Sequence, residues 1–255
     1  MNFINKHKTA DNITAMVRRA IIDAAALPED AMRLELLAKR LGALDADGTA
    51  RFFDELFNDT GNAHGAMKLK SAIINSEGLK RALGEEKYNG VFTASIRLRL
   101  RKVSCLFSEL PPLKKGLAGY DKEEEIKMEH MPLGIRRALS KKSVKDTIDR
   151  LLSDPDPIVI TNILNNPRTT EREVLKIASK RPNSPAILNA LANHKKWSKR
   201  YGVIKAIAMN PYSLPRVSIT LLEFLLSQDL MEVLDDNSLH PQVRINAKEI
   251  LEQKK

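Results

Sequence analysis

The stretch Val159-Ile160-Thr161-Asn162-Ile163-Leu164-Asn165-Asn166-Pro167 has a second version 44 residues later, Val203-Ile204-Lys205-Ala206-Ile207-Ala208-Met209-Asn210-Pro211. Apolar residues fall opposite apolar residues, and both versions end in Asn-Pro. Self-similarity with a period of about 20 to 50 residues is typical of proteins built from stacked units. The repeat therefore predicts a stack of short elements in the second half of this 255-residue chain.

These elements are predicted to be helices, because their apolar residues recur at three- and four-residue steps and their start signals are legible. Five starts are indicated, by capping-box spacing at Thr170–Glu173, by a cap followed by proline at Ser184-Pro185, and by Ser198, Pro215 and Pro241. Each helix is only about three turns long, so it cannot bury an apolar face alone and must stack on its neighbours.

The first half, from about residue 9 to residue 110, is predicted to hold four or five helices. Asp11 is expected to cap the first of them. Asp45-Ala46-Asp47-Gly48-Thr49 has the start of a calcium-loop pattern but lacks its later acidic positions, so a polar turn is favoured. Ser95–Lys102 alternates apolar and basic residues like a strand, yet helical spacing from Phe92 to Leu110 favours one helix.

The fold class is therefore all-α, with a right-handed α-α superhelix preceded by an N-terminal helical region. Residues 1–110 form the N-terminal region, residues 111–130 are a linker, and residues 131–255 form the helical-repeat part. The linker is indicated by Pro111-Pro112 and by the charged block Asp121–Lys127, which has little to bury.

The repeat region resembles two known kinds of helical repeat over roughly residues 131–250. Asp154-Pro155-Asp156-Pro157, followed by Asn166-Pro167-Arg168 and Leu175–Ala178, resembles the variant leucine-rich repeat, which implies 3₁₀ turns alternating with α-helices in a right-handed solenoid. Trp197–Ala206 resembles the second helix of a HEAT-like repeat, so both alternatives stay open. The stretch from Pro132 to Pro211 is also similar to a group of uncharacterised bacterial proteins. These resemblances imply an architecture and hardly any activity.

The amino-acid composition limits the possible disulfides and metal sites and indicates a cellular compartment. Cys105 is the only cysteine, which excludes an internal disulfide and any zinc or iron–sulfur site built on cysteines. The first residues have no apolar core of signal-peptide length, and no apolar run approaches the ~20 residues that span a membrane. A cytoplasmic protein without membrane contact is expected.

The net charge of +10 is concentrated in the middle of the chain. Residues 101–200 carry 21 basic and 12 acidic side chains, whereas residues 1–100 carry 15 and 13 and residues 201–255 carry 6 and 7. Such a distribution is typical of proteins that bind nucleic acid or an acidic protein surface.

Two basic clusters are the candidate binding residues. The first cluster is Arg168, Arg172, Lys176 and Lys180, which are spaced four residues apart. They form one stripe along a helix if that helix reaches back to Arg168. The second cluster is Lys195, Lys196, Lys199 and Arg200 around Trp197, the only tryptophan. A solvated helix face is the simpler interpretation of the charges. For Trp197, packing between helices is favoured over stacking on a base.

No catalytic residue, metal site or cofactor is predicted. The five histidines are scattered, and the sequence has no glycine-rich phosphate loop, nucleophile elbow or paired carboxylates in an apolar setting. The preferred hypothesis is a non-enzymatic scaffold that binds another protein, because repeat stacks commonly do so. The alternative is a nucleic-acid-binding repeat protein with a basic surface in residues 136–200. An enzyme acting on DNA is a third hypothesis, and the oligomeric state is not indicated.

Overall fold

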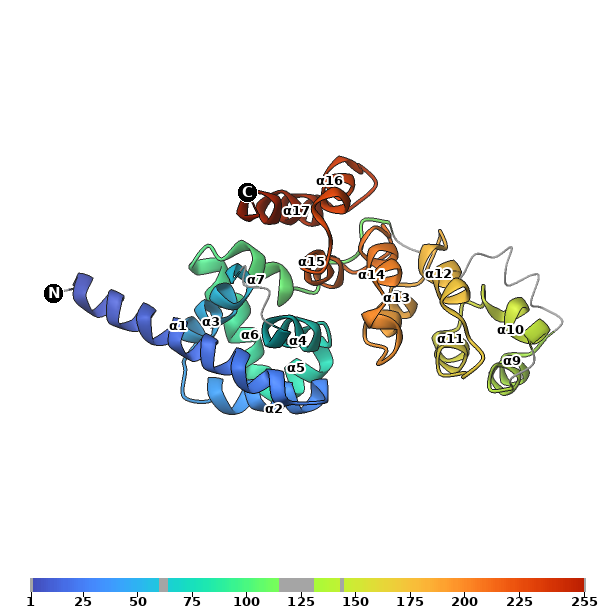
Figure 1. The fold of residues 1–255 in the computed structure, drawn as a ribbon, viewed down its shortest axis with the longest axis horizontal. Helices are drawn as coiled ribbons and strands as arrows, with labels where there is room; N and C mark the ends of the chain where they lie inside the picture. The colour runs from blue at the N-terminus through green and yellow to red at the C-terminus, as the bar shows by residue number, and fades with distance from the viewer. Residues whose placement is uncertain (1, 60–63, 115–130, 143–144, 255) are drawn as a thin grey trace. The chain divides into compact units, whose positions relative to one another are not determined.

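A computed structural model describes residues 2–59, 64–114, 131–142 and 145–254 (Figure 1). Within these ranges there are sixteen α-helices, one short 3₁₀ helix and no strand, which confirms the all-α class. No helix in the described ranges is long and apolar enough to cross a membrane. Most of the predicted linker, residues 115–130, lies outside the described residues.

The chain divides into two compact units, which are described separately. Unit 1 comprises residues 1–109 with residues 252–255, and unit 2 comprises residues 110–251. The helices of unit 1 are α1 (Asn2–Ala26), α2 (Asp30–Leu41), α3 (Ala46–Asn58), α4 (His64–Ile73), α5 (Ser76–Leu83), α6 (Glu85–Arg97) and α7 (Arg101–Leu106). These seven described helices exceed the four or five that the sequence predicted.

Aromatic side chains fill the core of unit 1. Phe53 packs edge-on against Phe52 and Phe107, with ring centroids 5.9 and 4.9 Å apart, and Tyr88 lies 4.8 Å from Phe107. Asp45, placed by the sequence in a polar turn, caps α3 by accepting a hydrogen bond from the N–H of Gly48 at 2.7 Å. Asp45 therefore ends the turn before α3, whereas Ala46 to Thr49 of the predicted turn belong to the helix itself.

Two sequence predictions for unit 1 are wrong. Helix α1 runs from Asn2 to Ala26, so Asp11 lies inside it and does not cap it. The single helix expected across residues 92–110 is broken after Arg97 by a turn in which Arg99 has φ +59°. The N–H of Arg99 donates to Ile96 O and that of Leu100 to Ser95 O, which is the Schellman ending usually made by glycine.

Unit 2 is a succession of short helices, seen in chain order from α9 to α14 in Figure 1. They are α9 (Leu133–Ser140), α10 (Lys145–Leu151), α11 (Pro157–Leu164), α12 (Glu171–Ser179), α13 (Pro185–Ala192), the 3₁₀ helix η1 (Trp197–Lys199), α14 (Tyr201–Ala208), α15 (Pro215–Leu222), α16 (Ser227–Asp235) and α17 (Pro241–Gln253). From α11 onward an α-helix begins about every 14 residues. Between α9 and α14 most of the packing joins helices two places apart, α11 with α9 and α13 and α14 with α12, whereas α14 also packs on the adjacent α15.

Three of the turns between these helices contain the same kind of hydrogen bond. A side chain six residues after a buried Ile donates back to the carbonyl oxygen of that Ile: Thr169 to Ile163 at 2.6 Å, Asn183 to Ile177 at 2.7 Å and Ser213 to Ile207 at 2.7 Å. The carbonyl groups at a helix C-terminus lack a partner within the helix, so this bond both satisfies one of them and closes the turn.

The asparagines of the two Asn-Pro pairs, Asn166 and Asn210, make equivalent hydrogen bonds. Asn210 donates its amide to Ala178 O and Lys180 O at 2.8 and 3.1 Å, at the end of α12, and its Oδ1 accepts the N–H of Tyr212 at 3.1 Å. Asn166 likewise donates to Lys142 O at 3.1 Å, just past the end of α9, and accepts the N–H of Arg168 at 3.1 Å. Each asparagine thus joins its own turn to the end of a helix two places back.

Most of the predicted helix starts in unit 2 are confirmed. Thr170 and Glu173 form a capping box, and Pro185, Pro215 and Pro241 each begin an α-helix. Ser198 is the exception, because it lies inside the 3₁₀ helix and the N-cap of α14 is Arg200.

Substitution of Asn210 with Ala is expected to lower the free energy of unfolding of unit 2 by about 1–3 kcal/mol, because two carbonyls at the end of α12 lose their donor. Chemical denaturation followed by circular dichroism measures this. Asn193→Ala is the matched control, because Asn193 is exposed and bonds only to Asn189 of its own helix. Equal stability of the two variants would contradict the bridging role.

Substitution of Gly65 with Ala is expected to destabilise unit 1 by about 1–3 kcal/mol, because an added Cβ would lie 1.9 Å from Ile21 O and push α4 away from α1. The control is Gly90→Ala in α6, where the nearest atom to an added Cβ is 3.4 Å away. That change should be neutral or stabilising by up to about 1 kcal/mol. Thermal unfolding of the two variants compares them directly.

Candidate functional site

The strongest concentration of charge in the described residues lies between residues 165 and 200. This stretch has nine basic and only two acidic side chains. Both acids are engaged, because Glu173 belongs to the capping box of α12 and Glu171 pairs with Arg200 at 3.8 Å. Eight of the nine basic side chains are exposed. Arg181 donates to Met209 O at 2.6 Å, and the other seven are called here the basic face: Arg168, Arg172, Lys176, Lys195, Lys196, Lys199 and Arg200.

Two contacts bring the two predicted clusters together by placing the turn before α12 beside the turn before α14. The indole Nε1 of Trp197 donates to Leu164 O at 2.9 Å. Nε2 of His194 lies 3.3 Å from Oδ1 of Asn165. The turn that contains Arg168 and the turn that contains Lys195 to Arg200 therefore lie next to each other.

The side-by-side packing of α12 and α14 extends this face along α12. Glu171 and Leu175, one turn apart, point toward the start of α14: Glu171 contacts Arg200, and Leu175 Cδ2 would lie 3.4 Å from a Cβ placed on Gly202. Arg172 and Lys176 are the next positions around the helix, so they lie together beside this contact.

Trp197 packs in the interior, as the sequence analysis favoured. Only 2% of its surface is exposed, and its nitrogen is bonded to the end of α11. The ammonium group of Lys196 lies 4.0 Å from the ring centroid, a distance at which a cation is attracted to an aromatic face. Trp197 therefore packs beneath the basic residues of its turn, in the protein interior, and a ligand cannot contact its ring.

His194 stabilises the turn before α14 and adds no positive charge to it. Burial, and then the nearby Lys196, lower the pKa of His194 below its ordinary value. Its Nδ1 accepts the N–H groups of Lys196 and Trp197 at 3.2 and 3.4 Å, which the neutral ring allows. Sequence reasoning missed the bracing by His194 and Asn165, because no local pattern links two residues 29 positions apart.

The predicted four-residue stripe is wrong at both ends. Helix α12 begins at Glu171, so Arg168 lies in the preceding turn. Lys180 is the C-cap with extended backbone, and its Nζ donates to Ser153 O at 2.8 Å. Only Arg172 and Lys176 share a helix face, because Lys180 is turned toward the end of α10.

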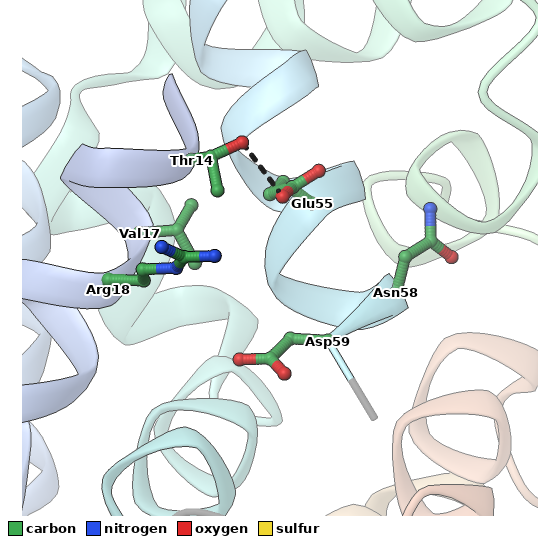
Figure 2. A pocket seen from close by; sticks show the side chains of 6 residues that line it. All are labelled: Thr14, Val17, Arg18, Glu55, Asn58 and Asp59. Carbon is green, nitrogen blue, oxygen red and sulfur yellow. Dashed lines mark hydrogen bonds between the residues drawn. The ribbon is translucent and has the colours of Figure 1, made fainter. Parts of the chain in front are cut away.

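A small pocket in unit 1 is a weaker candidate. Side chains of α1 and of the end of α3 line it, namely Thr14, Val17, Arg18, Glu55, Asn58 and Asp59 (Figure 2). Thr14 donates to Glu55 at 2.9 Å, and the lining carries charges of both signs. Asp59 is the last described residue before the gap at residues 60–63. Across the described ranges no group of three His, Cys, Asp or Glu residues is placed to hold a metal ion.

Comparisons with family models, with curated proteins and with solved structures gave no match.

The burial of Trp197 predicts a simple optical result. As the only tryptophan, it should emit at short wavelength and be quenched weakly by acrylamide. Saturating the protein with nucleic acid should leave its fluorescence nearly unchanged, because a base cannot stack on a buried ring. Strong quenching by nucleic acid would show that Trp197 contacts the ligand after all.

Proposed function

We propose that this chain is a non-enzymatic helical-repeat protein that binds nucleic acid through the basic face. The observation that carries the proposal is the joining of two basic turns, 165–170 and 193–200, by the bonds from Trp197 and His194. Lys and Arg side chains on one side of a fold are the usual means of neutralising phosphates. The proposal assigns no catalytic residue and no cofactor.

The make-up of the basic face favours phosphate over protein as its ligand. Interfaces between proteins commonly depend on aromatic or apolar anchors and are poor in Lys. No large apolar side chain is exposed between residues 165 and 200, and Tyr201 at the start of α14, which is 38% exposed, is the one exposed aromatic side chain that adjoins this stretch. The face instead combines Lys195, Lys196 and Lys199 with the N-terminus of α14, which has no side-chain cap and adds positive potential.

The superhelix belongs to the same proposal. A right-handed α-α stack, of HEAT-like or variant leucine-rich type, is supported by the contacts of α11 with α9 and α13 and of α14 with α12. In such a stack, successive turns line up along one side. A cytoplasmic location, expected from the single cysteine, is also part of the proposal.

A protein-binding scaffold is the second candidate, and a different surface favours it. Leu133, Ile135 and Ile158 are exposed on the first turns of the neighbouring helices α9 and α11. Arg137 of α9 donates to the N-cap Asp156 of α11 at 2.8 and 3.1 Å, which fixes the two helices side by side. Exposed apolar side chains on adjacent helices favour this candidate, because such side chains are commonly found where proteins make contact.

Binding to random duplex DNA is expected to be steeply salt-dependent and sensitive to charge reversal on α12. The Arg172→Glu/Lys176→Glu variant should bind at least about tenfold more weakly at low salt, because two phosphate contacts are lost and two repulsions are added. The matched control is Arg19→Glu/Lys39→Glu, which changes the net charge equally at exposed positions of unit 1. Fluorescence anisotropy across a salt series measures both effects.

Two results would contradict the proposal. One is weak binding whose logarithm is independent of salt, which would leave the protein-scaffold candidate as the better account. The other is equal weakening in the two double variants, which would show that net charge acts without any defined face.

A further inference from the structure

None of the residues of the basic face has an aromatic ring on which an unpaired base could stack. Trp197 is buried. Tyr201, which follows Arg200 and is 38% exposed, reaches to the start of α16, where its hydroxyl donates to Asp229 and accepts the N–H of Leu226 at 3.1 Å. His194 is half-buried and held through both ring nitrogens. Proteins that bind single strands combine a basic groove with aromatic rings, and stacking supplies about 1–3 kcal/mol per base.

The amide side chains of the same turns are also engaged within the protein. Nδ2 of Asn165 donates to Thr161 O at 2.9 Å, while its Oδ1 faces His194. Nδ2 of Asn193 donates to Asn189 O at 2.8 Å. Amides are the usual readers of adenine, and these two are already oriented by internal bonds. What the turns present to a ligand is therefore mainly positive charge.

The charges are held on a braced support. The bonds from Trp197 to Leu164 O and from His194 to Asn165 tie the two turns together. A duplex has one phosphate charge per ~1.7 Å of its axis and stays straight over tens of base pairs, so its charges also hold fixed positions. A single strand must be ordered on binding, and this face offers no stacking to compensate.

We infer that the ligand of the basic face is double-stranded nucleic acid, bound through its phosphates and without preference for sequence. The inference rests on the proposed function and specifies the form of nucleic acid. Phosphate contacts position a protein on a duplex and carry no sequence information. The side chains that make them are those of the basic face, with Arg172, Lys176 and Lys199 projecting from α12 and η1.

The number of contacts limits the expected salt dependence. If about five side chains of the basic face neutralise phosphates, the logarithm of the affinity falls with the logarithm of salt at a slope of about −4.5, so raising salt fourfold weakens binding about 500-fold. Glu171 works against this attraction from within the face. Glu171→Gln removes one negative charge beside Arg200 and should tighten duplex binding by about two- to fivefold.

The test measures anisotropy of the full chain with five labelled probes. They are an AT-rich DNA duplex and a GC-rich DNA duplex, each of about 30 base pairs, a duplex RNA and a single-stranded DNA of the same length, and polyglutamate. The two DNA duplexes should bind within about threefold of each other and at least about tenfold more tightly than the single strand or polyglutamate. The duplex RNA shows whether the phosphates of both helical forms are accepted.

Variants separate the possible failures. Lys199→Glu should weaken every duplex, whereas Lys39→Glu, an equal change of charge at an exposed position of unit 1, should leave duplex affinity within about twofold. Tighter binding of the single strand, or equal binding of polyglutamate, overturns the inference. If the single strand binds more tightly, the proposed function of nucleic-acid binding still stands. Failure to bind any of the nucleic acids overturns the proposed function itself.

Discussion

The satisfaction of backbone groups at helix ends is the constraint on which this structure depends. A helix leaves about four N–H and four C=O groups without partners in its own backbone, so one of eight residues leaves as many open as it satisfies. In the described part of unit 2, six α-helices have eight residues or fewer, and each needs partners from outside its own backbone. Thr169, Asn183 and Ser213 satisfy a carbonyl in their own turns, while Asn166 and Asn210 reach a helix two places back. These few polar side chains therefore hold the stack in register as well as closing the turns.

The same need for partners at helix ends explains the role of several basic side chains. Basic side chains donate to carbonyl oxygens at the C-terminal ends of helices in both units: Arg33, Lys68, Lys70, Lys87, Lys102, Lys180, Arg181 and Arg244. Lys70 and Lys102 are buried in doing so. Such contacts complement the negative end of the helix dipole. Part of the excess of Lys and Arg thus serves folding, which is why net charge alone overstated the surface left for a ligand.

The sequence predicted features set by neighbouring residues and missed those set by distant ones. The capping box at Thr170 and the prolines that open α13, α15 and α17 are local signals, and the structure has them. The end of α6 was missed because Arg99 takes a conformation that usually calls for glycine. Lys180 was placed on a helix face because its partner, Ser153 O, lies 27 residues earlier. The burial of Trp197 was anticipated from its pattern, but the bracing of the basic face by His194 and Asn165 depends on tertiary contacts.

The spacing of the helices has a consequence for how such a chain can change its length. The duplicated Asn-Pro stretches lie on α11 and α14, three helix steps apart, whereas packing joins helices two steps apart, such as α9, α11 and α13. Between α9 and α14, loss or gain of one helix with its turn would shift each later helix by one place and separate helices that now pack together. Loss or gain of two would preserve this packing. Evolution of this architecture by insertion and deletion should therefore proceed in pairs of helices.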